Sequence, residues 1–476
     1  MTPPWILHFL QVCVFICFIH LGLVTASFLG LLILGVMENG ARRREDSSED
    51  YEAIAESRFT IPVSVVCPAY NEEAMVVHTV RSVLASQYPE FEVILVNDGS
   101  RDATLEVLRR EFKLERREVF YRRVLSSTAP TAVYRSRSEP RLTVIDKPNG
   151  GKADALNCGI NFARFRYVCC VDGDTVFHKE ALLRGMRLIL RDPARVLGAT
   201  SHVAISNTPE ANLTEEEERP VVPDLLNNYQ HIDYLRSFMN SRLGWSRLNF
   251  MLCSVGAFAI WRRDTLVELG GFSGNFTCED IEMTFRVHHR ELREKRDYSI
   301  LSLSDTVGHT EGPERVVHLV SQRARWQRVI METVWHYRGM FMNPRYGTVG
   351  MLGVPFYVLA EVVAPLFELL AILTAIAAMV LGVYSWRQMF LFLGFISFLN
   401  ASFSTASLLL KDLSSSEYRL RDLVRLALIG PLELVLYRPW LTYARLLGTL
   451  GFLRGDKSWN KFARNTRSAA ESQREP

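Results

Sequence analysis

The sequence predicts an α/β protein, in which a soluble domain with a mostly parallel sheet lies between apolar ends that are long enough to enter a membrane. Apolar residues concentrate in 5–36 and again from 349 onward. Between them, short β-favouring runs alternate with helical spacing, which is typical of parallel strands joined by helices. One run, 168–171, stops abruptly at Asp172 and Asp174. Strand ends of this kind face the ligand cleft in open α/β sheets.

Length and composition limit the class of protein. A chain of 476 residues is longer than one hydrophobic core usually organises, so we expect at least two structural units. The formal net charge of +3 is too small to indicate a nucleic-acid partner. The eight cysteines contain no Cys-x-x-Cys pair, so we expect buried thiols of a reducing compartment.

The first apolar segment predicts a transmembrane helix over residues 1–37. It is too long for a signal-peptide core and no basic residue precedes it, so we expect it to stay attached. Arginines at 42–44 follow directly, and positive charge of this kind marks the cytoplasmic side of a membrane. We therefore expect the amino terminus outside and a cytoplasmic linker, flexible or helical, over 38–57.

The soluble domain is expected over residues 58–346 and begins with two strand–loop–helix units. Parallel strands end at the same edge of a sheet, so the loops after these two strands should lie beside Asp172 and bind a base and ribose. The candidates are Ala69, Tyr70, Glu72 and Asp98. A turn at 97–100 with Asp98 as a helix cap would explain the second loop equally well. The sequence has no G-x-G-x-x-G or Walker lysine loop, which argues against a dinucleotide cofactor.

The loop at 147–152 is glycine-rich and basic. Gly151 allows the backbone to approach a ligand, Lys152 adds a positive charge for a phosphate, and a helix begins there. Helix capping alone would explain the glycines. The functional interpretation is favoured because loop, helix end and carboxylates are all expected at one edge of one sheet.

Asp172 and Asp174 predict a metal site. The two-residue period of a strand would place both side chains on one side, where two carboxylates are hard to keep ionised without a cation. Mg²⁺ or Mn²⁺ suits them best, because these ions take one or two carboxylates and complete their shell with phosphate oxygens and water. The alternative is a solvated turn.

Two later segments supply an acid–base candidate and a phosphate-binding candidate. Glu279 and Asp280 stand at a predicted helix start, and Asp280 is the candidate base for an acceptor hydroxyl. A helical segment carries Gln322, Arg325 and Trp326. A planar guanidinium can hold a diphosphate, and an indole offers a flat face to a sugar ring. Acidic residues that favour a helix start and a plain amphipathic helix are the alternatives.

Several motifs occur in a fixed order: Pro-Ala-Tyr-Asn-Glu at 68–72, Asn-Asp-Gly-Ser at 97–100, Asn-Gly-Gly-Lys-Ala-Asp-Ala-Leu-Asn at 149–157, Asp-Gly-Asp at 172–174 and Gln-x-x-Arg-Trp at 322–326. In this order they resemble the membrane-embedded glycosyltransferases of family 2, which include the synthases of cellulose, chitin, hyaluronan and poly-N-acetylglucosamine. Cys278 stands where the family usually has threonine before Glu-Asp, and both acidic residues are kept. The resemblance covers 62–335.

The resemblance implies a GT-A-like fold and an inverting, metal-dependent transfer of a sugar from a nucleotide-sugar, with UDP as its carrier, to a growing β-linked polysaccharide. It assigns the metal to Asp174, the uridine to Tyr70, Glu72 and Asp98, and the ribose or diphosphate to Gly151, Lys152 and Asp172. By the same resemblance the base is Asp280, and Gln322, Arg325 and Trp326 close over the diphosphate and the acceptor. Ala69 and Glu279 are expected to be further substrate-binding residues. Expected partners are a polysaccharide or lipid-linked acceptor, membrane lipid and accessory export proteins, without nucleic acid.

Two other functions stay open. One is a single, non-processive transfer to a lipid or short acceptor. The other is a non-catalytic membrane subunit or transporter that keeps the fold. Intact carboxylates argue against a dead scaffold, and the lack of paired repeats argues against a transporter.

The carboxyl-terminal part predicts an interfacial helix at 347–364, spans at 365–386 and 389–410, and cytoplasmic interfacial helices with a basic tail at 411–476. Prolines and the charges Glu433, Arg438 and Arg445 interrupt the last apolar segment. Each of these charges would cost roughly 2.5–3.5 kcal/mol at mid-membrane, so we expect this segment at the interface.

The three-span topology predicts the labelling of single cysteines placed at Ser385 and Ser468, in a variant whose native cysteines are replaced. An impermeant thiol reagent added outside is expected to label the first position only, because the short turn is external and the basic tail is cytoplasmic. Permeabilised membranes, in which both positions should react, provide the control. External labelling at Ser468 would overturn this topology.

Overall fold

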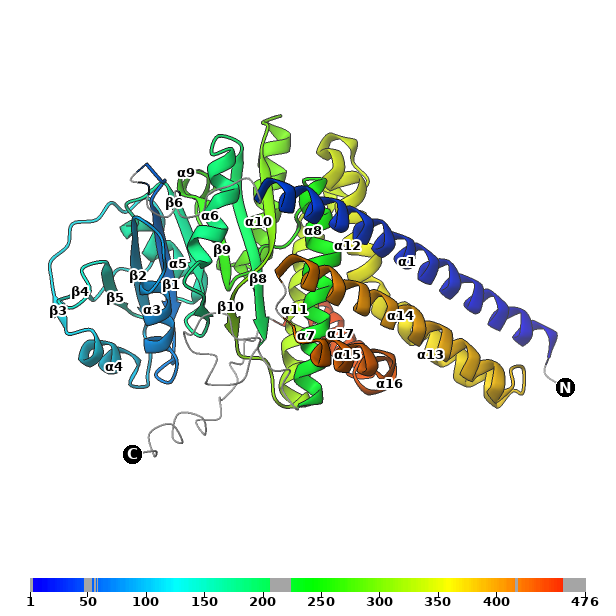
Figure 1. Ribbon diagram of the computed structural model, residues 1–476. Coiled ribbons are helices and arrows are strands. Elements are labelled where there is room, and N and C mark those ends of the chain that lie inside the picture. Colours follow the sequence, from blue (N-terminus) through cyan, green and yellow to red (C-terminus); the bar gives the residue numbers. More distant parts are fainter. Residues whose placement is uncertain are drawn as a thin grey trace. The chain divides into compact units, whose positions relative to one another are not determined.

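The computed structural model describes residues 3–46, 54, 57, 59–205, 224–415 and 418–456. Within these residues the chain forms two compact units, each with its own contacts. The helical unit contains 3–40, 224–248 and 313–456, and the α/β unit contains 41–205 and 249–312. Figure 1 shows the strands of the α/β unit and the long helices of the helical unit.

The α/β unit is built on one sheet with the strand order β3-β4-β5-β2-β1-β6-β9-β8-β10-β7. The strands are β1 (Val63–Ala69), β2 (Phe91–Asp98), β3 (Leu114–Arg116), β4 (Ala132–Ser136), β5 (Leu142–Lys147), β6 (Tyr167–Val171), β7 (Val176–Phe177), β8 (Val196–Ile205), β9 (Phe258–Arg262) and β10 (Ser299–Thr310). The central strands β1, β2 and β6 are buried along their whole length. Burial on both faces explains why they are continuous apolar runs in the sequence.

The sheet is mixed, so the prediction of a mostly parallel sheet is not exact. β1 pairs in parallel with β2 and β6, and β2 with β5, as the strand–loop–helix units predict. However, β4, β9 and β7 run antiparallel to β5, β6 and β10. Two consecutive strands can pair in parallel only if the connection between them has about a dozen residues or more. The link at 137–141 is too short for this, so β4 and β5 form a hairpin.

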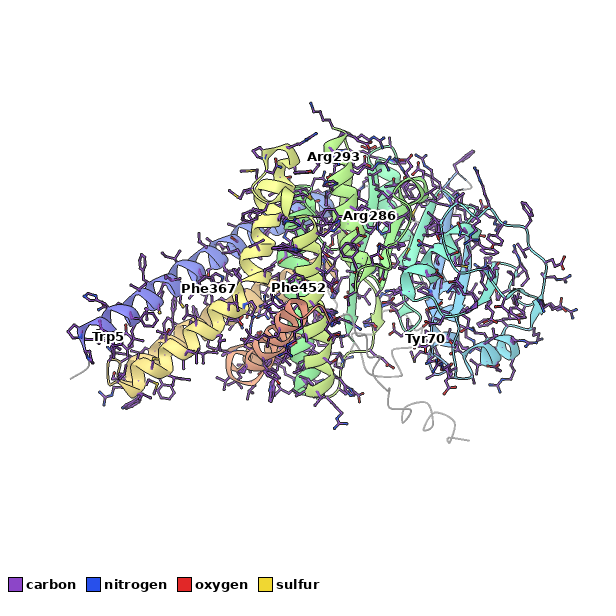
Figure 2. The ribbon with its side chains drawn as sticks, turned by 180° about the vertical axis from the view of Figure 1, so that it is seen from behind. Trp5, Tyr70, Arg286, Arg293, Phe367 and Phe452 are labelled. Atoms are coloured by element: carbon purple, nitrogen blue, oxygen red, sulfur yellow. The ribbon has the colours of Figure 1, made fainter. Side chains whose placement is uncertain are left out.

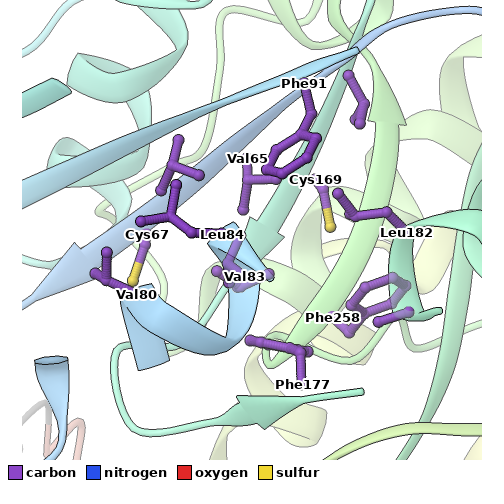
Figure 3. Packing of buried hydrophobic residues seen from close by; sticks show 14 of the residues in the cluster. Val65, Cys67, Val80, Val83, Leu84, Phe91, Cys169, Phe177, Leu182 and Phe258 are labelled. Atoms are coloured by element: carbon purple, nitrogen blue, oxygen red, sulfur yellow. The ribbon is translucent and has the colours of Figure 1, made fainter. Parts of the chain in front are cut away.

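The helices of the α/β unit are α3 (Val76–Leu84), α4 (Thr104–Glu111), α5 (Lys152–Phe162), α6 (Ala181–Arg191), α9 (Arg263–Glu268) and α10 (Glu279–Arg293). Alternate side chains of β1 pack on opposite faces of the sheet. Val65 joins the core that contains Val83 of α3 and Leu182 of α6 (Figure 3). Val66 lies against Gly159 of α5, where a Cβ atom would be 2.4 Å from Val66 Cγ1. The missing side chain lets α5 approach β1 closely, which fixes the position of its amino end.

The helical unit contains α1 (Pro4–Asp46, whose last turn belongs to the α/β unit), α7 (Leu225–Leu235), the π-helix η1 (Arg236–Arg242), α8 (Leu243–Arg247), α11 (Val316–His336), η2 (Arg338–Met340), η3 (Pro344–Tyr346), η4 (Val349–Gly353), α12 (Val354–Tyr357), η5 (Val358–Val362), α13 (Ala364–Val380), α14 (Trp386–Ser415), α15 (Leu420–Ile429), η6 (Gly430–Leu432), α16 (Glu433–Leu436) and α17 (Arg438–Leu453). Among the described residues, two helices are long and apolar enough to cross a membrane, at Pro4–Glu45 and Trp386–Leu413. The pair Val349–Val362 and Ala364–Val380, bent by 40°, would make a third if it counts as one span.

These helices differ in extent from the predicted segments. α1 continues beyond residue 37 into the predicted linker, and α13 is shorter than the predicted span 365–386. Trp5 lies near the amino end of α1 and is 71% exposed (Figure 2). Phe367 of α13 stacks on His20 of α1 with ring centroids 4.1 Å apart.

The charges of the last apolar segment all have partners inside the helical unit. Glu433, with 0% of its surface exposed, accepts two hydrogen bonds from Arg236, at 2.8 and 2.6 Å, and pairs with Arg438 at 3.2 Å. Arg445 pairs with Glu361 at 3.1 Å. The insertion cost that we assigned to these charges applies to unpaired groups. Because each is neutralised within the protein, the charges are compatible with either an interfacial or a membrane-buried segment.

Some predicted segments lie outside the described residues. They are residues 47–53, 55 and 56 of the linker, residues 58 and 206–223 of the soluble domain, and the basic tail from 457 onward, which includes Ser468.

Candidate active site

The Asp172–Asp174 segment follows β6 as a turn, because the strand ends at Val171. The two-residue period that we applied to this segment therefore does not hold. The turn is fixed against its neighbours: Thr79 of α3 donates a hydrogen bond to the carbonyl of Gly173 at 3.1 Å. A Cβ atom at Gly173 would be 3.0 Å from the Pro68 carbonyl oxygen and 3.5 Å from Ala69. Predicted site residue Ala69 is thus a direct neighbour of the aspartate turn.

Lys152 connects this turn to the predicted base region. Its ammonium is 2.7 Å from Asp172 Oδ1 and 2.9 Å from Glu279 Oε1. Lys152 is the first residue of α5, and Glu279 is the first residue of α10. The half-buried Lys152 ammonium therefore joins the end of β6 to the starts of α5 and α10, which are distant in the sequence.

Asp280 lies beside this ion pair. Its Oδ2 accepts a hydrogen bond from Gly256 N at 3.1 Å, and its Oδ1 accepts from Ile281 N at 2.7 Å. A Cβ atom on Gly256 would be 3.0 Å from Lys152 Nζ and 3.1 Å from Asp280 Oδ2. The backbone of Gly256 therefore lies directly against both groups.

Carboxylates dominate the electrostatics of this cluster. Burial raises the pKa of Asp172 above its usual value, and the charge of Asp174 adds to this, while Lys152 opposes it. Burial and the Glu279 carboxylate likewise raise the pKa of Asp280. Burial disfavours the Lys152 ammonium, but Asp172, Glu279 and Asp280 outweigh it and raise its pKa well above the usual value. Closely placed carboxyls that raise each other's pKa are a setting that favours a bound cation.

Asp98 is the last residue of β2, so it lies at the carboxyl end of the strand, as predicted. Its side chain accepts hydrogen bonds from the backbone amides of Gly150 and Gly151, both at 2.9 Å, and it forms an ion pair with Lys147. Only 4% of the side chain is exposed. Asp98 therefore shapes the glycine-rich loop that leads to Lys152. Its contact with a base stays a prediction.

The loops after β1 and β2 are joined to each other, as expected for neighbouring parallel strands. Asn71, which has a φ of 53°, donates its backbone N–H to Ser100 Oγ at 3.0 Å. The backbone N–H of Glu72 donates to Thr104 Oγ1 at 2.9 Å. Glu72 is buried and Tyr70 is half-buried at this edge of the sheet (Figure 2). Their binding of a nucleoside stays a prediction.

Asn157 is a positioning residue that the sequence did not reveal by itself. Its side-chain amide donates to the Phe272 carbonyl at 2.8 Å and accepts from the Phe272 N–H at 2.7 Å. Gly271 has a φ of 79°, and a Cβ there would be 2.3 Å from Asn157 Oδ1. The asparagine of the 149–157 motif and the Gly270-Gly271 pair thus form one contact, which fastens α5 to the segment that leads into α10.

The remaining predicted residues, Gln322, Arg325 and Trp326, lie on α11 in the helical unit. All three are partly exposed. Their closure over a diphosphate and acceptor stays a prediction.

The turn that carries Asp172 and Asp174 fits Mg²⁺ or Mn²⁺ bound together with substrate phosphates. Among the residues that the structure describes, no group of three or more His, Cys, Asp or Glu side chains gathers in a way that could hold a metal alone. Mg²⁺ and Mn²⁺ typically bind through one or two carboxylates together with substrate phosphates. Asp172 and Asp174 supply carboxylate oxygens for this arrangement, and the Asp174 charge contributes to the raised pKa of Asp172.

Comparison with known proteins agrees with the motifs. The family model "Glycosyl transferase family 2" matches residues 64–264, and "Glycosyl transferase family group 2" matches 167–401. The poly-β-1,6-N-acetyl-D-glucosamine synthase of Staphylococcus epidermidis is 26% identical over 279 residues, which are 57% of this chain and 56% of that protein. The corresponding synthase of Staphylococcus aureus strain COL is 26% identical over 266 residues, 56% of this chain and 53% of its own length. The chain thus matches about half the length of these relatives.

The fold also matches a solved structure. A mannosyltransferase from Pyrobaculum calidifontis aligns with a TM-score of 0.53 and 16% identity, over 91% of this chain and 99% of its own. At this identity the likeness establishes the fold alone. It confirms the predicted GT-A-like α/β class, in which the sheet of this chain is mixed.

The close contacts at Gly256 predict the effect of a single methyl group on stability. Gly256→Ala is expected to lower the free energy of unfolding by about 1–3 kcal/mol, the usual cost of overpacking, because the new Cβ meets Lys152 and Asp280. Gly274→Ala is the control, since no atom lies within 4 Å of its added Cβ. Thermal unfolding of both variants in the same detergent gives the comparison. Equal stability of the two would show that the floor at Gly256 is not tight.

Proposed function

Because this chain carries a family 2 glycosyltransferase domain, we propose that it transfers a sugar from a nucleotide-sugar to a growing β-linked polysaccharide at the cytoplasmic face of a membrane. The observation that carries the proposal is the contact of Lys152 with both Asp172 and Glu279, with Asp280 alongside. It brings a donor-binding turn and a candidate base to the same point of the α/β unit. A reaction between a donor and an acceptor needs that proximity.

The proposed reaction is a single displacement with inversion. The acceptor hydroxyl oxygen forms a bond to the anomeric carbon as the bond from that carbon to the diphosphate breaks. Asp280 takes the hydroxyl proton on a carboxylate oxygen. The Asp280 carboxylate accepts one backbone hydrogen bond on each oxygen and a further one from the Cys278 side chain, which leaves acceptor capacity for a proton. Its raised pKa strengthens it as a base.

The donor diphosphate is proposed to lie over the aspartate turn and the loop before α5. Lys152 and the backbone of Gly151 contact its oxygens, and Asp174 holds the metal ion. When bound, Mg²⁺ or Mn²⁺ would neutralise the diphosphate as it departs, which is the largest charge change of the reaction. Ala69, Tyr70 and Glu72 would seat the nucleoside beside the turn, with Asp98 as a further contact.

The identity of the sugar follows from the relatives rather than from a contact. Their names specify β-1,6-linked N-acetylglucosamine, and we propose UDP-N-acetylglucosamine as the donor. The mannosyltransferase with the similar fold carries GDP-mannose and Mn²⁺, so the fold alone does not select a nucleoside or a sugar. A panel of labelled nucleotide sugars, added to purified membranes, tests the choice.

The helical unit is proposed to bind the acceptor and the membrane. Arg325 and Gln322 would contact the diphosphate, and Trp326 would stack on the acceptor sugar. A lipid-linked acceptor and accessory export proteins remain as partners in this proposal. A single labelled sugar on a lipid, in place of a polymer, would favour the non-processive alternative.

Asp174→Asn is expected to abolish transfer, because the diphosphate charge and its metal then lose their carboxylate ligand. Transfer in wild-type membranes should also disappear in excess chelator and return on adding Mn²⁺ or Mg²⁺. The variant should insert and elute like the wild type in detergent, which separates loss of activity from loss of folding. Full turnover in excess chelator would rule out the metal-dependent mechanism.

Asp280→Asn is expected to lower turnover by about 10²-fold or more, the usual scale for loss of a general base, with donor affinity nearly unchanged. Donor affinity is measured by equilibrium binding of the nucleotide sugar and turnover by product formation. Glu279→Gln is the matched variant, since it changes the neighbouring carboxylate that contacts Lys152. If Asp280→Asn keeps wild-type turnover and Glu279→Gln does not, Glu279 is the base.

A further inference from the structure

The indole of Trp326 has a cation over one of its faces. The guanidinium carbon of Arg323 lies 4.4 Å from the ring centroid, three residues earlier on α11. Tyr234 of α7 lies at the same place, with its ring centroid 6.1 Å from that of Trp326 and 5.7 Å from the Arg323 guanidinium. Residues three apart on a helix share one face, so this contact is built into α11. A sugar can then stack on Trp326 only from the face that Arg323 does not cover.

Arg323 is itself held in place by two side chains. Its Nη2 is 2.9 Å from Asp233 Oδ2 of α7 and donates to the Tyr437 hydroxyl at 3.4 Å. Only 12% of the Arg323 side chain is exposed. A planar guanidinium that is paired at its edge and stacked on its face has little rotational freedom, and the ring against it is restricted as well.

The pairing continues away from Trp326 into the carboxyl-terminal helices. Asp233 also contacts Arg236 at 3.3 Å, and Arg236 forms two hydrogen bonds with the fully buried Glu433. Asn400 of α14 donates to the same carboxylate at 2.8 Å. Positive and negative side chains thus alternate from Arg323 of α11, beside Trp326, to the first residue of α16. They include side chains of α7 and η1.

A series of buried ion pairs adds little to the stability of a protein, but it restricts the orientation of the side chains in it. Desolvation largely cancels the attraction in buried ion pairs, and apolar residues of similar volume are often as stable. Paired charges with hydrogen bonds nevertheless permit only a few arrangements of the side chains. The expected contribution of Arg323 is therefore the orientation of the group that it covers.

We propose that Arg323 is a positioning residue for Trp326 and that the Asp233–Arg236–Glu433 chain holds it there, so that acceptor binding depends on the carboxyl-terminal helices. The inference rests on the proposed function in one respect, namely that Trp326 contacts the acceptor sugar. A purely structural role of Arg323 would instead join α7 to α11 without an effect on one substrate in particular.

Arg323→Lys separates these roles, because lysine keeps the charge opposite Asp233 and loses the flat face over the indole. We expect kcat/KM for an added β-1,6-linked N-acetylglucosamine oligosaccharide to fall about tenfold, the order of a desolvated cation–π contact. The KM for UDP-N-acetylglucosamine should stay within about twofold of the wild type. Arg328→Lys is the matched control: Arg328 lies on the same helix, is buried, and pairs with Asp456 at 3.3 Å.

A double-mutant cycle with Trp326→Leu tests the route of the effect. If Arg323 acts through the indole, Arg323→Lys should have no further effect on acceptor kcat/KM in the Trp326→Leu protein. A tenfold loss in both backgrounds, or an equal loss with Arg328→Lys, would overturn the inference. If Trp326→Leu lowers acceptor kcat/KM and Arg323→Lys does not, the inference alone is wrong. If Trp326→Leu has no effect, the proposed acceptor role of Trp326 is wrong as well.

Discussion

The two ion pairs of Lys152 are the interaction on which the candidate active site depends. One ammonium contacts the turn after β6 and the first residue of α10, while Lys152 itself begins α5. Without it, Asp172 and Glu279 would face each other as uncompensated carboxylates in a partly desolvated place, and the start of α10 would lose its link to the sheet. Asp98 supports this arrangement, because it accepts hydrogen bonds from the loop that precedes Lys152. Asn157 supports it from the other end, through the segment that leads into α10.

The arrangement of charged side chains differs between the two units, and the difference agrees with their proposed functions. In the α/β unit, burial and neighbouring carboxylates raise the pKa of Asp172 and Asp280, which favours the binding of a further cation. In the helical unit, carboxylates and guanidinium groups alternate and satisfy one another, as Glu433 does with Arg236 and Arg438. Closely spaced like charges suit the binding of a charged substrate and a metal ion. Alternating charges suit a scaffold whose helices must keep a fixed arrangement near a membrane.

The sequence motifs predict that the ends of several strands and helices meet at one site. The structure does bring Asp172, Lys152, Glu279 and Asp280 together. Their partners were not predictable. The sequence predicts a phosphate as a ligand of Lys152, and the structure shows that its ammonium also pairs with two carboxylates. It predicts a base beside Asp98, and the structure shows that this side chain also accepts hydrogen bonds from backbone amides. Lysine and aspartate have the same local sequence signature in either situation. Which partner a charge meets depends on segments far along the chain, so neither spacing nor composition contains that information.

The sequence by itself determined the α/β class, the long apolar helices, and the positions at which polar residues end the strands, because these features follow from the spacing of apolar residues within short windows. Only the tertiary structure decided the direction of β4, β7 and β9 and the partners of Arg236, Arg323 and Glu433. A strand has the same residue pattern whichever way its neighbour runs, and a charged residue in an apolar segment has the same composition whether it is paired or exposed. Strand direction and ion pairing are both long-range contacts, and they exist only once the whole chain has folded around them.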